Sequence, residues 1–198
     1  MRKLKKTLTI ALICATTLSV ASSRASENPS HAQSNIQEFK KITIDGNVSV
    51  TLVSSNNFGI IYNDENSGNA KVLQKGNSIR ITGLTKQVTA VTIYVKDIYR
   101  IEAYDNVTIK TNGKLRTQYL QVYLRDNSNA ELEVNNNGMQ AQLKGNSSIR
   151  LSGKTDDIQI EASESTKMSI DKLKWTNITS GEFVAYLYNA PDNNTLAQ

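Results

Sequence analysis

The chain has 198 residues, with one cysteine, one histidine and a formal net charge of +5. Five of its 23 basic residues and none of its 18 acidic residues lie in residues 1–25, so the remaining 18 basic residues balance the acidic ones. A neutral chain after residue 25 argues against a nucleic-acid partner, which requires a basic surface. Because Cys14 and His31 both precede the patterned part of the chain, histidine-dependent hydrolases and zinc enzymes are also disfavoured.

The N-terminus predicts a secretory signal peptide in residues 1–25. Four basic residues precede an apolar run at residues 8–21, and small residues follow up to Ala25. This run is too short and wrongly flanked for a membrane span. Cleavage after Ala21 or after Ala25 fits the pattern. Lipidation of Cys14 is the less favoured alternative, because Ile13 precedes it where a small residue is expected. We therefore expect an exported protein of the periplasm, the outer surface or the extracellular space, with no transmembrane span.

The rest of the chain divides by composition. Residues 26–38 are rich in Ser, Asn and Gln and predict a flexible leader. Residues 39–190 predict a single domain of ordinary size, and residues 191–198 a C-terminal tail. The only prolines, Pro29 and Pro191, lie outside the patterned region, so no proline interrupts a sheet.

From Phe39 onward, apolar and polar residues alternate, which is typical of half-buried strands. Ile42 and Ile44 are followed by a Gly-Asn turn and by the next alternating run from Val48. No run with helical spacing follows the signal peptide. The sequence therefore predicts an all-β protein.

Residues 98–170 repeat one pattern four times, at steps of about twenty residues, which indicates a solenoid. Each copy has a strand, a polar turn and a second strand, with turns at Asp105-Asn106, Asp126-Asn127, Gly145-Asn146 and Glu164-Ser165. Aligned on the turns, the copies give two apolar columns before the turn and two after it, and only Thr111 departs from this character. The columns are Ile101, Val122, Ala141, Ile160; Ala103, Leu124, Leu143, Ala162; Ile109, Ala130, Ile149, Met168; and Thr111, Leu132, Leu151, Ile170.

This repeat predicts a right-handed parallel β-helix with coils of about twenty residues. The alternative is an antiparallel β-sandwich that uses the same turns as hairpins. We expect the turn asparagines to bond to their copies on the next coil, without a metal or other cofactor.

The alternating pattern resembles that of the head GIN domain family. The matching residues are Phe39, Lys40, Ile42, Ile44, Gly46, Val48, Val50 and Leu52, then 77–81, then Val91, Ile93 and Val95, then Ile101, Ala103, Asp105 and Val107. Members of this family are described as auto-transporter adhesin heads and are common in exported proteins of Bacteroidetes-type bacteria. The resemblance implies a β-helix outside the cytoplasm and supplies no catalytic residues.

The outward columns of the repeat form a polar face that is our candidate binding site for a cell-surface glycan or protein. Its side chains combine amides, tyrosines and charges, which bind through stacking and hydrogen bonds. The candidate residues are Arg100, Glu102, Tyr104, Gln121, Tyr123, Arg125, Gln140, Gln142 and Lys144.

We expect an exported non-enzymatic protein of adhesin-like or cell-envelope function. One alternative is a carbohydrate-active enzyme, a polysaccharide lyase or hydrolase, with carboxylates among Glu102, Asp156, Asp157 and Glu161. Glu102 and Glu161 fall in one column three coils apart, about 14 Å, beyond the roughly 9.5 Å limit of an inverting pair. A second alternative is a periplasmic scaffold without an external ligand.

The ends of a solenoid expose unpaired backbone groups and need a cap or a partner. The aromatic stretch at residues 183–188 is expected to act either as a cap or as an oligomer contact.

Overall fold

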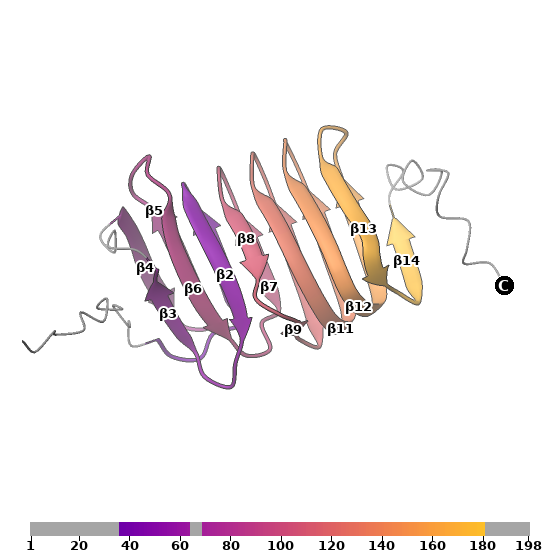
Figure 1. The fold of residues 1–198 in the computed structure, drawn as a ribbon, viewed down its shortest axis with the longest axis horizontal. Coiled ribbons are helices and arrows are strands. Elements are labelled where there is room, and N and C mark those ends of the chain that lie inside the picture. Colours follow the sequence, from indigo (N-terminus) through magenta and orange to yellow (C-terminus); the bar gives the residue numbers. More distant parts are fainter. Residues whose placement is uncertain (1–35, 64–68, 181–198) are drawn as a thin grey trace, which may run out of the picture. The chain divides into compact units, whose positions relative to one another are not determined.

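The computed structural model describes residues 36–63 and 69–180, which form one β-sheet (Figure 1). Its strands are β1 (Lys41–Asp45), β2 (Val48–Ser54), β3 (Gly59–Tyr62), β4 (Ala70–Lys75), β5 (Ser78–Gly83), β6 (Thr89–Val95), β7 (Arg100–Ala103), β8 (Thr108–Thr111), β9 (Leu115–Arg116), β10 (Tyr119–Leu124), β11 (Asn129–Leu143), β12 (Ser148–Ala162), β13 (Lys167–Lys174) and β14 (Asn177–Ser180). The all-β prediction is confirmed. The predicted signal peptide, residues 26–35 of the leader, the tail and the aromatic stretch 183–188 lie outside the described residues.

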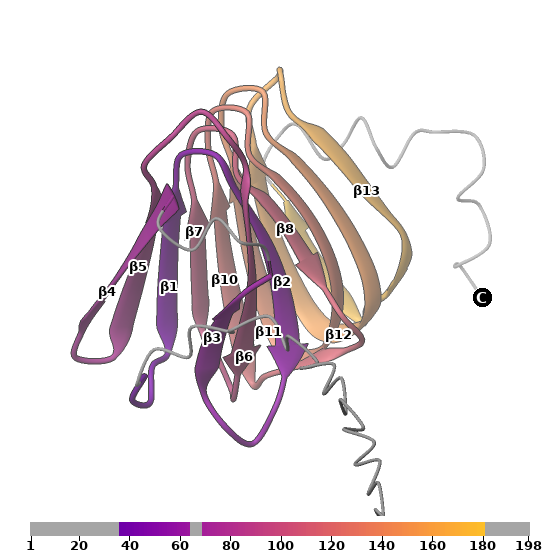
Figure 2. The same cartoon turned by 60° about the vertical axis from the view of Figure 1, so that its left-hand side comes forward.

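The sheet curls, so that it has two facing arms (Figure 2). The β7 arm contains β5, β1, β7 and β10, and the β8 arm contains β6, β2 and β8. β11 is 15 residues long and belongs to both arms, because its first part pairs with β8 and its last part with β10. β12 pairs with β11 along this whole length, which continues both arms.

The predicted right-handed parallel β-helix is wrong. All fourteen strands lie in one curled sheet of mixed direction, in which β3 pairs antiparallel with β6, and β4 with β5. Residues 135–138 and 153–157, which join successive copies of the repeat and would be loops in such a β-helix, are continuous strand within β11 and β12. The antiparallel sandwich is not found either, because the pairs between the repeated strands are parallel. Equal spacing and alternation predicted which strands are neighbours, but they do not determine where a strand bends or how the sheet closes.

The predicted register within the repeat is confirmed for three of the four columns. Ile101, Val122, Ala141 and Ile160 are successive partners across β7, β10, β11 and β12. The column that begins at Ala103 and the column that begins at Ile109 pair in the same way. Of the fourth column, only the pair Leu132–Leu151 is found, because the ladder of β8 and β11 ends at Lys110–Glu131 and the register of β12 and β13 shifts between Arg150 and Ser152. A β-bulge of this kind inserts an extra residue that no repeat pattern reveals.

The hydrophobic core lies between the two arms. Ile101, Val122 and Ile160 from the β7 arm and Ile109 from the β8 arm are all 0% exposed. Near β13 and β14 the packing thins, because the equivalent side chains there, including Met168 and Ile178, are only partly buried. Within the described residues β13 and β14 have no strand beyond them, since both pair with β12 alone.

The turns at one end of the arms form the predicted asparagine ladder. The amide of Asn106 donates to Asn47 (3.0 Å), that of Asn127 to Asn106 (3.2 Å), and that of Asn146 to Asn127 (3.4 Å). The left-handed backbone positions precede these asparagines, at Gly46, Asp105, Asp126 and Gly145. The asparagines therefore supply hydrogen bonds between successive turns rather than unusual backbone angles.

Candidate functional site

The nine candidate residues lie on the outer surface of the β7 arm, where side chains alternate with those of the core. Two rows of partners cross β7, β10 and β11, and a third row continues at the residues that follow these strands. The rows are Arg100, Gln121, Gln140; Glu102, Tyr123, Gln142; and Tyr104, Arg125, Lys144. The structure thus brings the whole set together, and we call it the polar face.

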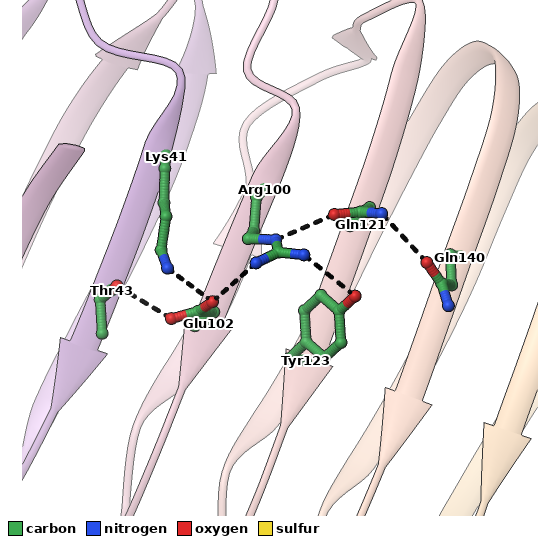
Figure 3. A network of polar contacts seen from close by, with 7 residues as sticks. All are labelled: Lys41, Thr43, Arg100, Glu102, Gln121, Tyr123 and Gln140. Atoms are coloured by element: carbon green, nitrogen blue, oxygen red, sulfur yellow. Dashed lines mark hydrogen bonds and ion pairs between the residues drawn. The ribbon is translucent and has the colours of Figure 1, made fainter. Parts of the chain in front are cut away.

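Arg100 organises the first two rows of the polar face (Figure 3). Its Nε donates to Oε1 of Gln121 at 2.9 Å, and its Nη2 donates to the hydroxyl of Tyr123 at 3.3 Å. The guanidinium carbon lies 4.7 Å from the centroid of the Tyr123 ring, within the range of a cation–π contact. The Nε2 of Gln121 then donates to Oε1 of Gln140 at 3.1 Å, so one hydrogen-bonded chain crosses three strands.

Glu102 anchors this network toward β1. One carboxylate oxygen lies 2.7 Å from Nζ of Lys41 and 3.5 Å from Nη1 of Arg100, and the other accepts from the hydroxyl of Thr43 at 3.1 Å. Partial burial alone would raise the pKa of Glu102, but the hydrogen bond and charge of Lys41, with Thr43 and Arg100, lower it below its ordinary value. Glu102 is therefore held as a carboxylate with its oxygens occupied, the opposite of what a general acid needs.

The third row is more exposed and is positively charged. The guanidinium carbon of Arg125 lies 5.9 Å from the ring centroid of Tyr104. Arg125 and Lys144 both face solvent at the ends of β10 and β11. The polar face therefore has two parts: an ordered hydrogen-bond network beside β1 and β7, and exposed cations near the turns.

Glu102 and Glu161, two of the carboxylates considered for catalysis, are not brought together. Register places Glu102, Tyr123, Gln142 and Glu161 in one row, so Glu102 and Glu161 are three strand spacings apart, about 14 Å. Glu161 accepts a 2.8 Å hydrogen bond from Gln142. Asp156 pairs with Lys154, and Asp157 accepts from Asn177. Neither retaining nor inverting glycoside hydrolysis fits this spacing.

The structure adds residues that the sequence did not single out. Lys41 and Thr43 join the polar face, because β1 pairs with β7 at Lys41–Arg100 and Thr43–Glu102. Their outward position follows from the alternation with Ile42 and Ile44, but the repeat starts at Ile98 and gives no sign that β1 lies beside β7.

Two shallow hollows lie on the outer surface. One, of about 430 Å³, borders the polar face and is lined by β10, β11, β12 and β14, with Tyr119, Gly138 and Asp157 among its residues. The other, of about 310 Å³, lies on the β8 arm across β8, β11, β12 and β13. Within residues 36–63 and 69–180, no three His, Cys, Asp or Glu side chains gather in a metal-binding group. The same residues contain no helix of the length and apolarity needed to cross a membrane.

Solved structures share this fold at low sequence identity. A "putative adhesin" from Bacteroides fragilis has a TM-score of 0.68 at 14% identity, over 75% of this chain and 73% of its own. A "putative adhesin" from Parabacteroides merdae has a TM-score of 0.54 at 13% identity, over 76% of each chain. A "putative lipid binding protein" from Parabacteroides distasonis has a TM-score of 0.56 at 11% identity, over 78% of each chain.

No curated protein matches the chain. A family model does, over nearly all of the described sheet. Residues 38–181 match the model described as "Putative auto-transporter adhesin, head GIN domain", so the chain belongs to the head GIN domain family.

Proposed function

We propose that the protein is exported and acts without catalysis, as an adhesin-like component of the cell envelope that binds a cell-surface glycan or protein through the polar face. The observation that carries the proposal is the ordered network of Arg100, Gln121 and Tyr123 on an exposed sheet surface. The family to which the chain belongs supports the same reading through its adhesin description.

Order within the network lowers the cost of binding. Immobilising a long side chain at an interface costs about 0.5–1.5 kcal/mol. The side chain of Arg100 is already fixed by Gln121, Tyr123 and Glu102, so a partner would not meet this cost at that position. Arg and Tyr are also the residue types that most often dominate binding energy at interfaces.

The same contacts weigh against an enzyme. The carboxylate of Glu102 is engaged by Lys41 and Thr43, and the next carboxylate in its row is Glu161. A carbohydrate-active enzyme would instead need two free carboxylates within about 10 Å. Release of reducing ends by the purified protein, lost in Glu102→Gln or Glu161→Gln, would overturn the non-enzymatic assignment.

The binding test uses charge reversal at the exposed end of the face. The protein is purified in the form that remains after processing by the cell. It is then applied to a glycan array and to an array of extracellular proteins. Arg125→Glu with Lys144→Glu should weaken binding about tenfold or more, because both cations border any partner on this face. Lys110→Glu with Lys167→Glu makes the same charge change on the β8 arm and should leave binding intact.

The proposal fails if the two double variants lose binding equally or not at all. Retention of the protein in the cytoplasm, measured by cell fractionation, would contradict export. An exported protein that binds nothing on either array would instead be the scaffold without an external ligand.

A further inference from the structure

Two neighbouring rows of side chains line the hollow beside the polar face. Tyr119, Gly138, Asp157 and Asn177 are successive partners across β10, β11, β12 and β14 and form one row. The neighbouring row along the strands contains Gln121, Gln140 and Gln159. Between these rows the hollow has a volume of about 430 Å³, within the usual range of about 300–1,000 Å³ for small-ligand sites.

Tyr119 lies over Gly138, and a side chain at Gly138 would displace its ring. A Cβ on Gly138 would stand 2.8 Å from Cδ1 and 2.9 Å from Cε1 of the tyrosine ring. The backbone of Gly138 is not left-handed, so its conformation would accept any residue. Glycine is what allows the ring to rest in this position. Tyr119 is nonetheless 65% exposed, so the ring remains available to a ligand.

Amide groups line the rest of the hollow. Arg100 donates to Gln121, which donates to Gln140, and this order leaves Nε2 of Gln140 without a partner among the described residues (Figure 3). Polarisation along such a chain strengthens the terminal donor. The amide of Asn177 donates to Asp157 at 2.7 Å, which leaves the oxygen of Asn177 as an acceptor. The hollow therefore offers one aromatic ring together with both donors and acceptors.

The lining also restricts the class of ligand. Asp157 is the only charged residue among those that border the hollow. A carboxylate or phosphate ligand would meet this negative charge without any compensating cation. A lipid tail would cover polar amides without pairing them, which costs free energy. A ligand with hydroxyl groups and a C–H face matches the lining, because hydroxyls donate and accept while C–H groups pack on the ring.

We propose that this hollow binds a neutral sugar ring, which stacks on Tyr119 and hydrogen-bonds to Gln140, Asp157 and Asn177. The proposal rests on the proposed function, since it names the ligand class of one part of the same surface. A second unit of a sugar chain would continue along the row toward Gln159, across the strands.

Calorimetric titration tests the site, with maltotriose and cellotriose as neutral probes. The protein is used in the form that remains after processing by the cell. Trigalacturonic acid serves as the acidic probe, and phosphatidylcholine vesicles test for a lipid surface. At least one neutral trisaccharide should bind, and Tyr119→Ala should weaken its Kd about tenfold or more. Gly138→Ala should do the same, because the added Cβ displaces the ring without touching the core. Tyr99→Ala is the matched control, because Tyr99 is exposed on the same arm outside the hollow.

The inference is overturned if neither trisaccharide binds, if Tyr119→Ala and Tyr99→Ala act alike, or if the acidic probe or the vesicles bind as tightly as the neutral sugars. Far-UV circular dichroism verifies that each variant is folded. Binding to the arrays that depends on Arg125 and Lys144, together with silence toward the trisaccharides, would refute the sugar site and leave the proposed function standing. Sugar binding in a protein that remains in the cytoplasm would refute the proposed function and leave the sugar site standing.

Discussion

Replacing Gly153 by alanine should be among the most damaging single changes in the sheet. Gly153 lies within β12 opposite Val134 of β11, with a φ of +97°. A Cβ at this position would stand 2.1 Å from the carbonyl oxygen of Val134 and 3.0 Å from its nitrogen. Left-handed backbone costs a residue with a Cβ about 1–2 kcal/mol. Separating the two strands at this point would break at least two ladder bonds, at about 1 kcal/mol each. We expect a loss of about 3–4 kcal/mol in the free energy of unfolding.

Urea denaturation followed by circular dichroism measures this loss. Gly113→Ala is the matched control, because Gly113 also has a positive φ, of +76°, but no atom lies within 4 Å of its added Cβ. That variant should lose only the backbone cost of about 1–2 kcal/mol. The excess for Gly153→Ala therefore isolates the close approach of the two strands. Equal losses in the two variants would show that the contact with Val134 has no energetic weight.

Three further predictions concern the ladder, the carboxylate and the core. Asn127→Ala removes two rungs of the asparagine ladder and should cost about 1 kcal/mol, whereas an unchanged urea midpoint would make the ladder incidental. The pKa of Glu102 in the folded protein lies below its ordinary value of 4.5. Its carboxylate therefore stabilises the fold at pH values above 4.5, and this contribution is lost as the pH falls through the folded-state pKa. Glu102→Gln should therefore be less stable than the wild type at pH 7 and converge with it in acid; a constant difference across the titration would contradict the ion pair with Lys41. Ile160→Ala should cost about 2–5 kcal/mol, and Ile178→Ala less, because Ile160 is fully buried and Ile178 only partly so; equal thermal shifts would contradict the thinning of the core.

Residue alternation carried most of what could be predicted about the sheet. Side chains in a strand alternate strictly between faces, so the pairing of Ile101 with Val122 and of Val122 with Ala141 followed once the turns were aligned. The same rule placed Arg100 and Gln121 side by side on the outer surface. These statements require only local geometry and a constant step between copies.

Closure of the sheet could not be predicted in that way. Whether residues 135–138 form a loop or a bent strand depends on hydrogen bonds to neighbours, and here Asn135 and Asn136 pair with Lys154 and Thr155. The antiparallel strands β3 and β4 pair with β6 and β5 outside the repeated region, where no second copy fixed the register. Polar residues in a short segment are compatible with a turn and with a strand that faces solvent, so composition did not distinguish them.

The candidate site shows the same division. Its nine residues are outward positions of one repeat, and alternation is enough to find them. The partners of Glu102 come from elsewhere, Lys41 and Thr43 from β1. In the hollow beside these nine residues, Asp157 likewise accepts from Asn177 of β14. Only these contacts show that Glu102 is engaged and that Asp157 faces an amide. Sequence therefore located the surface, and the pairing of distant strands determined which polar groups it presents.

The core and the outer surface of the β7 arm depend on different residues, which bears on how binding can vary in such a fold. The free energy of unfolding rests on inward columns such as Ile101 and Val122, and on turns that bond to one another. The side chains of outward residues such as Arg125 and Lys144 are exposed and take no part in either. Their replacement should change binding with little effect on folding, since exposed substitutions usually alter stability by less than about 0.5 kcal/mol. Glu102 differs from these cations, because its carboxylate joins β1 to β7 as well as ordering Arg100. A variant at Glu102 should therefore lose stability and order in the polar face together, while the exposed cations can change alone.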